Sequence, residues 1–458
     1  MWEKLRIVFT IPELRQKILL TLLFLAIYRV GWHIPLPIFN QERGAEADQS
    51  QSAGFGDFVD QVAVFAASDL RQATIFGLGI MPYISASIIF QLLGTVWKPL
   101  EDLRKEGETG RKKINEYTRY VTVLLCFVQS WCYVFFYLMK SGGEKGSLIS
   151  EAFLSTPGDP MSLPFLWQLT AVMTMTCGTI FLMWLGEQID EFGIGNGISL
   201  LIMSGILAQM PNALMQLMGN VSWTLGASGG KFSIETIIVL AVLFVAVIAG
   251  VVFITLGQRR ITTQSAKHVR GRRVYGGGKQ FLPLKLNQSG VMPIIFASSL
   301  LMIPALLLKF LMSIVPGQDR ALNVVLSVFN GNSVVYNFLY IVLIYFFCYF
   351  WTAITFNPKE MADNLKDYGT FIPGYRPGKR TADYLEKVMV RITYVGAAFL
   401  AVSAIVPTVI SSSMGIPATI AGFYGGTGLL IAVSVAFDLV QKIDNHLLMR
   451  NYRGLIEN

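Results

Sequence analysis

The side chains that most often carry catalysis or bind metals are few in this sequence and lie apart from one another. The four cysteines (Cys126, Cys132, Cys177 and Cys348) each sit inside an apolar run, and none forms a Cys-x-x-Cys pair. The three histidines are isolated along the chain. Metal sites need such ligands at short, clustered spacings. We therefore expect no metal site and no cofactor, and interpret the cysteines as small hydrophobic residues.

Two glycine-rich stretches have the look of phosphate-binding loops but lack the residues that such loops need. A Walker A loop at 276–279 would require glycine where Arg273 stands and serine or threonine where Gln280 stands. The stretch at 193–197 follows no predicted strand. We interpret both as tight turns, the first joining residues 273–275 to 280–282 in a β-hairpin. The sequence thus predicts no ATP site and no enzyme.

The composition indicates a chain whose surroundings are lipid. Of its 458 residues, 53% are hydrophobic and 14% are charged, whereas soluble domains carry about a quarter charged residues. A membrane span needs roughly 20 mostly apolar residues. Such runs predict ten spans, at about 17–37, 75–97, 117–139, 165–187, 197–218, 234–256, 289–312, 334–356, 389–411 and 422–443. Gly, Ser and Pro in the fifth and tenth indicate protein-facing helices.

Lysine and arginine between these spans predict their orientation. Basic residues precede the first span and follow the second, sixth and eighth, and the loop at about 257–288 has no acid at all. Because basic loops stay in the cytoplasm, both termini are expected there, which an even number of spans satisfies. Residues 1–16 predict an amphipathic surface helix rather than a cleaved signal peptide. One short turn, with Glu187, Asp190 and Glu191, has acids and no bases.

The middles of the predicted spans are almost free of charge. A small-molecule secondary transporter, the first alternative, places ionisable residues near the midplane. Arg29 is the exception, and its place near Tyr28 and Trp32 at the outer end of the first span favours snorkelling to the interface. Other charged residues lie toward span ends, namely Arg119, Glu187, Lys309, Arg391 and Asp438. The pattern favours a pore with neutral walls; a purely structural scaffold is the second alternative.

Several strings carry a resemblance to a known family. They are GIMPYISAS at 79–87, GIGNGIS at 193–199, GQRR at 257–260 with GRRVY at 271–275, VMPIIFASS at 291–299, and FNPKEMADNL at 356–365 followed by PGYRPG at 373–378. In this order and spacing they resemble the SecY family, the channel-forming subunits of the bacterial Sec protein translocase. The resemblance implies an all-α polytopic membrane protein with ten transmembrane helices. These would form two inverted five-helix halves around a central pore, residues 17–218 and 234–443, joined by a hinge at 219–233.

The resemblance also implies a pore ring and a lateral gate. The ring positions are all isoleucine: Ile80, Ile84, Ile198, Ile202, Ile295 and Ile431. The first four form two i, i+4 pairs, so each pair shares one helix face, although ordinary core isoleucine is the alternative for each. The gate positions combine prolines, expected to weaken their helices, with small or polar residues: Pro82, Ser85, Ser87, Gln129, Asn287, Pro293, Ser298 and Ser299. For Gln129 and Asn287, a local hydrogen bond is the alternative to bridging the gate.

The remaining expectations from the resemblance concern the plug and the partners. The plug maps to about 62–76, with Val64, Phe65, Ala66, Ala67 and Ser68 near its middle. Cytoplasmic loops at about 257–288 and 357–388 would dock the ribosome and the SecA ATPase through Arg259, Arg260, Arg272, Arg273 and Arg376. Other expected partners are SecE, SecG, signal sequences, nascent secretory or membrane polypeptides, and lipids. Energy would come from the ATPase, the ribosome or the membrane potential. The expected location is the bacterial plasma membrane, and residues 444–458 would form a cytoplasmic tail.

Overall fold

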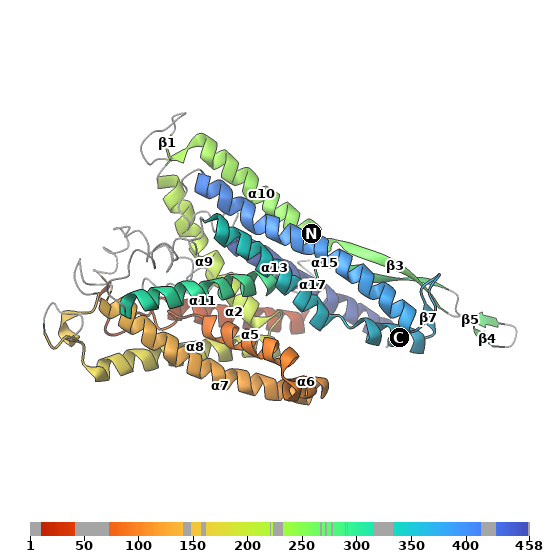
Figure 1. The fold of residues 1–458 in the computed structure, drawn as a ribbon, viewed down its shortest axis with the longest axis horizontal. Helices are drawn as coiled ribbons and strands as arrows, with labels where there is room; N and C mark the ends of the chain where they lie inside the picture. Colours follow the sequence, from red (N-terminus) through yellow and green to blue (C-terminus); the bar gives the residue numbers. More distant parts are fainter. Residues whose placement is uncertain are drawn as a thin grey trace. The chain divides into compact units, whose positions relative to one another are not determined.

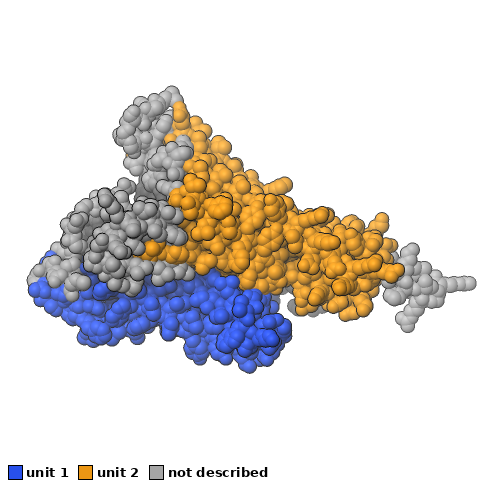
Figure 2. Space-filling model, in the orientation of Figure 1, with its two compact units in different colours: residues 1–216, 435–458 blue, residues 217–434 orange. Residues whose placement is uncertain are grey.

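The computed structural model describes residues 11–41, 73–140, 148–156, 162–219, 221–222, 232–265, 268–270, 273–275, 278–288, 290, 292–314, 333–413 and 427–456. The chain divides into two compact units, residues 1–216 with 435–458 and residues 217–434 (Figure 2). The predicted plug residues 64–68, most of the predicted hinge at 219–233 and the first ten residues of the predicted surface helix lie outside the described residues.

Unit 1 is a bundle of long apolar helices with one amphipathic corner. Its helices are α2 (Pro12–Trp32), α5 (Met81–Val96), α6 (Lys98–Lys105), α7 (Glu108–Tyr133), α8 (Phe165–Phe192), most of α9 (Gly197–Gly219) and most of α17 (Thr427–Ile456) (Figure 1). A π-helical turn, η1 (Val134–Lys140), continues α7, and a 3-10 turn, η2 (Glu151–Phe153), precedes α8. Helix α7 packs against both α5 and α8, and α2 packs against α8.

Irregular backbone in unit 1 is paired within the protein. The Leu36 N–H donates to the Ala73 carbonyl at 2.9 Å, and the Ile75 N–H donates to the Ile34 carbonyl at 3.0 Å. Non-helical backbone at membrane depth is tolerated only where protein or water satisfies it. The side chains of this region join one buried apolar cluster with the end of α7 and the start of α8, including Leu36, Ile38, Ile149, Val134, Leu138, Val172 and Met175.

Unit 2 combines apolar helices with a β-ribbon. The helices are α10 (Ile234–Leu256), α11 (Met292–Ile314), α13 (Val334–Thr355), α14 (Pro358–Asp367) and α15 (Lys379–Ser413). Helix α13 packs against α11 and α15, and α15 also contacts α10 and α14. The ribbon pairs β3 (Gln258–Ser265) antiparallel with β6 (Lys279–Lys285), and β7 (Thr370–Phe371) joins the other side of β3. A two-residue parallel pair, β1 (Val221–Ser222) with β2 (Phe232–Ser233), precedes α10.

The predicted hairpin between 273–275 and 280–282 is wrong in its pairing. Residues 280–282 pair with 261–263 of β3, whereas β5 (Arg273–Tyr275) pairs with β4 (His268–Arg270). Burial explains the choice, because Ile261 of β3 and Leu284 of β6 both enter an apolar cluster with Phe356, Ile372 and Leu385. Side chains alternate between the two faces of a strand, so a strand pairs in the register that buries its apolar face. The region is a long ribbon with a separate short hairpin.

All ten predicted spans contain helix, and the ends of several are shifted whereas α10 matches its predicted range of 234–256. Helix α2 begins at Pro12 rather than 17, α15 begins at Lys379 rather than 389, and α17 continues to Ile456 through most of the predicted tail. Helix α5 begins at Met81 rather than 75, and Pro82 takes the first turn, the helix position that favours proline. Within the described residues, five helical segments are long and apolar enough to cross a membrane: Phe165–Phe192, Gly197–Gly219, Glu235–Leu256, Val334–Asp367 and Lys379–Pro407. Helix α5 (Met81–Val96) and the part of α11 at Met292–Leu301 are shorter apolar stretches.

Candidate functional site

Ile80 and Ile84 lie at the start of α5. Ile80 is the residue that caps the helix, and the Ile84 N–H donates to its carbonyl at 3.1 Å. Both side chains are buried. The helix starts here because Gly79, at φ +55°, turns the chain in a conformation that side-chain-bearing residues rarely adopt. The glycine and Pro82 together therefore fix where the two isoleucines sit.

Ile198 and Ile202 lie in the first turns of α9, which two side chains cap. The Asp190 Oδ1 accepts the Gly197 N–H at 2.7 Å, and the Asn196 Oδ1 accepts the Ser199 N–H at 3.0 Å. These bonds satisfy amide groups that a helix start leaves without partners. Ile202 is buried and Ile198 is half-buried. Asp190, at the end of α8, thereby holds the start of the helix that carries both isoleucines.

The other two predicted ring residues belong to unit 2. Ile295 lies in the first turns of α11 and Ile431 in the first turns of α17, and both are buried. The Ile295 carbonyl accepts the hydroxyl groups of Ser298 at 2.9 Å and of Ser299 at 2.8 Å. The six isoleucines thus come from four helices, and their convergence on one axis stays a prediction.

The sequence predicts that the two gate prolines weaken their helices, but neither proline lies in a helix interior. Pro82 is the second residue of α5 and Pro293 the second residue of α11. Proline is favoured at the first turn, where its missing N–H costs no hydrogen bond. Both prolines therefore start a helix. Within α11 the interior proline is Pro304 instead.

The polar gate residues bond mostly within their own segments. The Gln91 side-chain amide donates to the Ser87 hydroxyl at 3.1 Å, and Ser298 and Ser299 donate to their own helix as described above. The Asn287 side-chain amide donates to the Gly290 carbonyl at 2.9 Å, which is the local bond that the sequence left open as an alternative. Ser85 on α5 and Gln129 on α7 are half-buried. Because these polar groups are hydrogen-bonded within their own segments, the helices present small side chains that adhere only weakly to a neighbouring helix.

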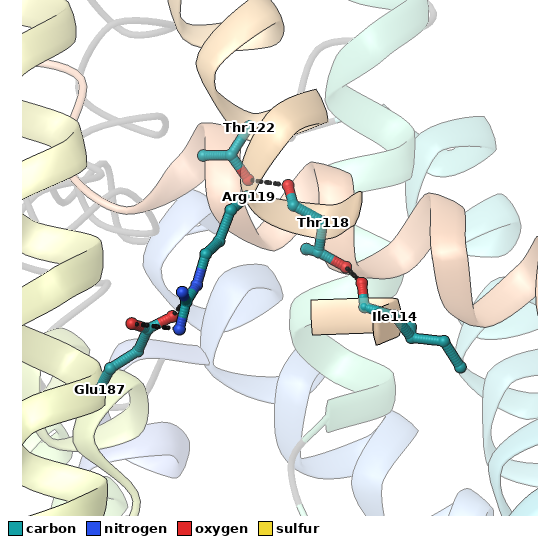
Figure 3. Close-up of polar contacts among 5 residues, drawn as sticks. All are labelled: Ile114, Thr118, Arg119, Thr122 and Glu187. Carbon is teal, nitrogen blue, oxygen red and sulfur yellow. Dashed lines mark hydrogen bonds and ion pairs between the residues drawn. The ribbon is translucent and has the colours of Figure 1, made fainter. Parts of the chain in front are cut away.

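A polar cluster that the sequence did not predict joins α7 and α8. The Arg119 Nε donates to the Glu187 Oε1 and its Nη2 to the Oε2, each at 2.8 Å (Figure 3). One turn further along α8 lies Asp190, with Lys442 of α17 in electrostatic reach. The Ile194 N–H donates to the Thr21 hydroxyl of α2 at 3.2 Å. Glu187 and Asp190 therefore have partners inside unit 1, although the turn itself contains no bases.

Arg29 lies in the last turn of α2, and its snorkelling to the interface stays a prediction. Its guanidinium carbon is 4.9 Å from the centroid of the Trp32 ring. A cation over an indole face is stabilised by the ring quadrupole. The neighbouring Tyr28 ring stacks on Phe76 at 6.3 Å, and Phe76 stacks on Phe181 of α8 at 6.1 Å. The arginine thus lies beside an aromatic stack that links α2 to α8.

The predicted docking arginines have different settings. Arg259 and Arg260 are exposed on β3, and Arg376 is exposed in the turn between β7 and α15. Arg273 lies in β5, and Arg272 is outside the described residues. The Arg376 turn is held by Gly374 and Gly378, at φ +90° and +105°, and by the Thr381 hydroxyl, which donates to the Arg376 carbonyl at 2.9 Å. The turn therefore presents Arg376 on a defined backbone.

The amphipathic helix α6 carries an exposed ion pair. The Lys105 Nζ lies 2.8 Å from the Glu101 Oε1, one helical turn away. The hydrogen bond and the charge of Lys105 hold the pKa of Glu101 below its ordinary value, and the same contact raises the pKa of Lys105. Such i, i+4 pairs on an exposed helix face contribute little to stability. Among the described residues, no cluster of three His, Cys, Asp or Glu side chains is arranged to hold a metal ion.

The fold and the composition define a multi-pass α-helical membrane protein. Residues 74–440 match the SecY family model. The chain is 42% identical over 456 residues to the protein translocase subunit SecY of Chlamydia muridarum, covering 99% of this chain and 98% of that protein. It is 40% identical over 457 residues to the subunit of the same name from Aquifex aeolicus, with full coverage of both chains (100% each). The chain belongs to the SecY family.

Two solved structures with the same fold are described as channels. A structure described as a protein conducting channel matches with a TM-score of 0.60 at 20% identity, covering 94% of this chain and 92% of that one. Sec61 in a canine ribosome-channel complex from the endoplasmic reticulum matches with a TM-score of 0.57 at 19% identity, with the same coverage (94% and 92%). At these identities the likeness shows a shared fold.

Proposed function

We propose that this protein is a protein-conducting channel. It passes unfolded secretory polypeptides across the membrane and releases transmembrane segments sideways into the bilayer through a lateral gate. Membership of the SecY family, which covers residues 74–440, carries the proposal. As a channel subunit the protein is not an enzyme, and translocation draws on a partner ATPase, the ribosome or the membrane potential.

The six isoleucines form the seal of this channel. An apolar neck only a few waters wide tends to dewet, and ions then cannot cross without losing their hydration. Isoleucine offers no hydrogen bond to a passing chain, so a polypeptide slides through without being held. Five of the six side chains are buried and the sixth is half-buried, which supports an apolar neck in the resting protein.

An isoleucine-to-asparagine exchange in the ring tests this function. Ile80→Asn places an amide in the neck, wets it, and is expected to raise the resting ion conductance of reconstituted channels in planar bilayers several-fold. Ile89→Asn is the matched control, since Ile89 lies on the same helix with 40% of its surface exposed. Elution as a single folded species checks both variants. A folded Ile80→Asn channel as tight as the control contradicts the seal.

The lateral gate lies between α5 and α11 in this proposal, and the plug at about 62–76 sits beneath the isoleucine ring. Small side chains and hydroxyls bonded within their own helix support an interface that parts and reseals. A signal sequence is a helix with a short apolar core. When the signal sequence partitions into lipid through the gate, it favours the open state, because the signal sequence binds the open channel more tightly than the closed one.

The cytoplasmic ribbon and the Arg376 turn dock the partners. Arginine suits both the phosphates of ribosomal RNA and the carboxylates of a protein, and Arg259, Arg260, Arg272, Arg273 and Arg376 are the proposed contacts. These partners are the ribosome and the SecA ATPase, with SecE and SecG as membrane subunits and signal sequences, nascent polypeptides and lipids as ligands. The proposed location is the bacterial plasma membrane with both termini in the cytoplasm, supported by the basic loops.

A further inference from the structure

The Arg119–Glu187 ion pair lies outside the proposed ring, gate, plug and docking positions. We propose that it is a positioning element for channel opening: it fixes the register of α7 against α8, and so the frame against which the gate helix α5 moves. The inference rests on the proposed function and adds that this ion pair influences how easily the channel opens.

The geometry of the pair favours orientation over stability. Two nitrogen atoms of Arg119 meet the two oxygen atoms of Glu187, each at 2.8 Å. A bidentate contact of this kind fixes the angle between two side chains as well as their distance. The side chains are 48% and 28% exposed, and an ion pair so open to solvent adds little stability. What it adds is a defined orientation between two helices.

A second contact repeats the same register further along the two helices. The Ser130 hydroxyl lies 3.5 Å from the Thr176 hydroxyl. This contact is eleven residues from the ion pair on both helices, and eleven residues make about three turns. Each helix therefore presents one face to both contacts, and the two helices run antiparallel between them. A slide or rotation of α7 breaks both contacts at once.

The buried residues of α7 near these two contacts have small side chains, and Cys126 between them lies in contact with Thr176 and Thr179 of α8. Thr118, Thr122 and Cys126 follow one another at four-residue spacing on α7, and all are buried. The threonine hydroxyls donate within α7, from Thr118 to the Ile114 carbonyl at 2.8 Å and from Thr122 to the Thr118 carbonyl at 2.7 Å (Figure 3). Small residues allow close approach with modest adhesion. In this proposal the two polar contacts, and the bidentate ion pair above all, set the register.

Helix α5 is attached to this frame. It packs against α7, where the Phe90 and Tyr117 rings stack at 6.5 Å. Tyr83 of α5 lies in electrostatic reach of both Glu187 and Arg119. Its neighbour Ile84 is a proposed ring residue, and Ser87 a proposed gate residue. A shift of α7 against α8 thus reaches the start of the gate helix.

Charge reversal separates this role from general stability. The variants are Arg119→Glu, Glu187→Arg and the double exchange, in the full chain reconstituted into vesicles with its translocase partners. The control variants are Glu101→Lys and Lys105→Glu, which break the exposed pair on α6 in the same unit. Two preproteins are compared, one with an intact signal sequence and one with a shortened apolar core. The readouts are the ratio of the two ATP-driven translocation rates and the thermal unfolding midpoint.

A loosened frame lowers the cost of opening, so a weaker signal suffices. Each single reversal is expected to raise the ratio of defective to intact translocation about fivefold, and the double exchange to restore it, with the α6 variants unchanged. Arg119→Lys, which keeps the charge and loses the bidentate contact, gives a smaller rise and serves if a reversal fails to fold.

An unchanged ratio in folded Arg119→Glu and Arg119→Lys channels overturns the inference, as does a double exchange that behaves like the single reversals. A fall in the unfolding midpoint with no change in ratio also overturns it, since that is the result of a purely structural role. Failure of the wild-type channel to move the intact preprotein overturns the proposed function itself, and with it this inference.

Discussion

Gly186 and Gly197 bring the backbones of α8 and α9 together at the start of α9. A Cβ atom on Gly197 would overlap the Gly186 carbonyl oxygen, and a Cβ on Gly186 would lie 3.2 Å from the Ile198 side chain. Backbone atoms in a packed interface cannot move aside as a flexible side chain does. The position of Ile198 beside α8 therefore depends on two residues that have no side chains.

Gly197→Ala is expected to destabilise unit 1 by about 2 kcal/mol, the usual cost of forcing extra volume into a packed site. Gly219→Ala is the matched control at the other end of α9, where an added Cβ meets nothing within 4 Å. Alanine there is expected to be neutral or to stabilise by up to about 1 kcal/mol. The thermal unfolding of both variants in detergent measures the difference, and equal midpoints contradict the close crossing.

The acids of the α8–α9 turn show what the sequence alone does not reveal about single residues. Glu187 and Asp190 are visible in the sequence as charges near a span end. Their partners are Arg119, far away in the chain, and the Gly197 N–H. Neither spacing nor charge identifies such a pairing, because it depends on which helices pack together. Ile80, Ile84, Ile198 and Ile295, by contrast, lie in motif strings that can be read without knowing the packing, and their common role stays a prediction.

At the scale of elements, the apolar runs predict all ten helices, whereas only some of the helix ends match. Each of the ten runs contains helix, because a long apolar run is suited to a helix whether it packs against protein or faces lipid. The ends depend on single residues, as Pro82 shows for α5. The β-ribbon was mispaired because residues 261–263 and 273–275 offer similar partners for 280–282, and only the cluster around Ile261 and Leu284 decides between them.

The turn between β7 and α15 carries a prediction about the motor. Arg376→Glu is expected to reduce ATP-driven translocation at least several-fold while resting ion conductance stays at the wild-type level, because a reversed charge at a rigid turn repels its partner. The Tyr375 and Tyr384 rings, 4.2 Å apart, hold the turn against α15. Arg380→Glu is the control, an exposed arginine in the first turn of that helix. Equal translocation by the two variants argues against docking through Arg376.

At the scale of the whole molecule, the proposed ring draws on both units. Ile80, Ile84, Ile198 and Ile202 belong to unit 1, whereas Ile295 and Ile431 belong to unit 2. A seal built from two separately packed units can open by a movement between them, without unfolding either one. The same division means that each unit, taken by itself, holds an incomplete ring. Under the proposal, sealing therefore requires residues of both units.

A translocating chain tests that property directly. Single cysteines at Ile80, Ile202, Ile295 and Ile431, in a chain whose four native cysteines are replaced by alanine, are expected to crosslink to a thiol-reactive probe at one position of a stalled secretory polypeptide. Ile89 and Ile238, which are 40% and 58% exposed, provide matched positions on α5 and α10 that should remain unlabelled. Shifting the probe along the polypeptide should move all four ring signals together, because a ring at one depth meets one residue of the passing chain at a time. Labelling confined to the positions of a single unit, or equal labelling at Ile89 and Ile238, contradicts a shared neck.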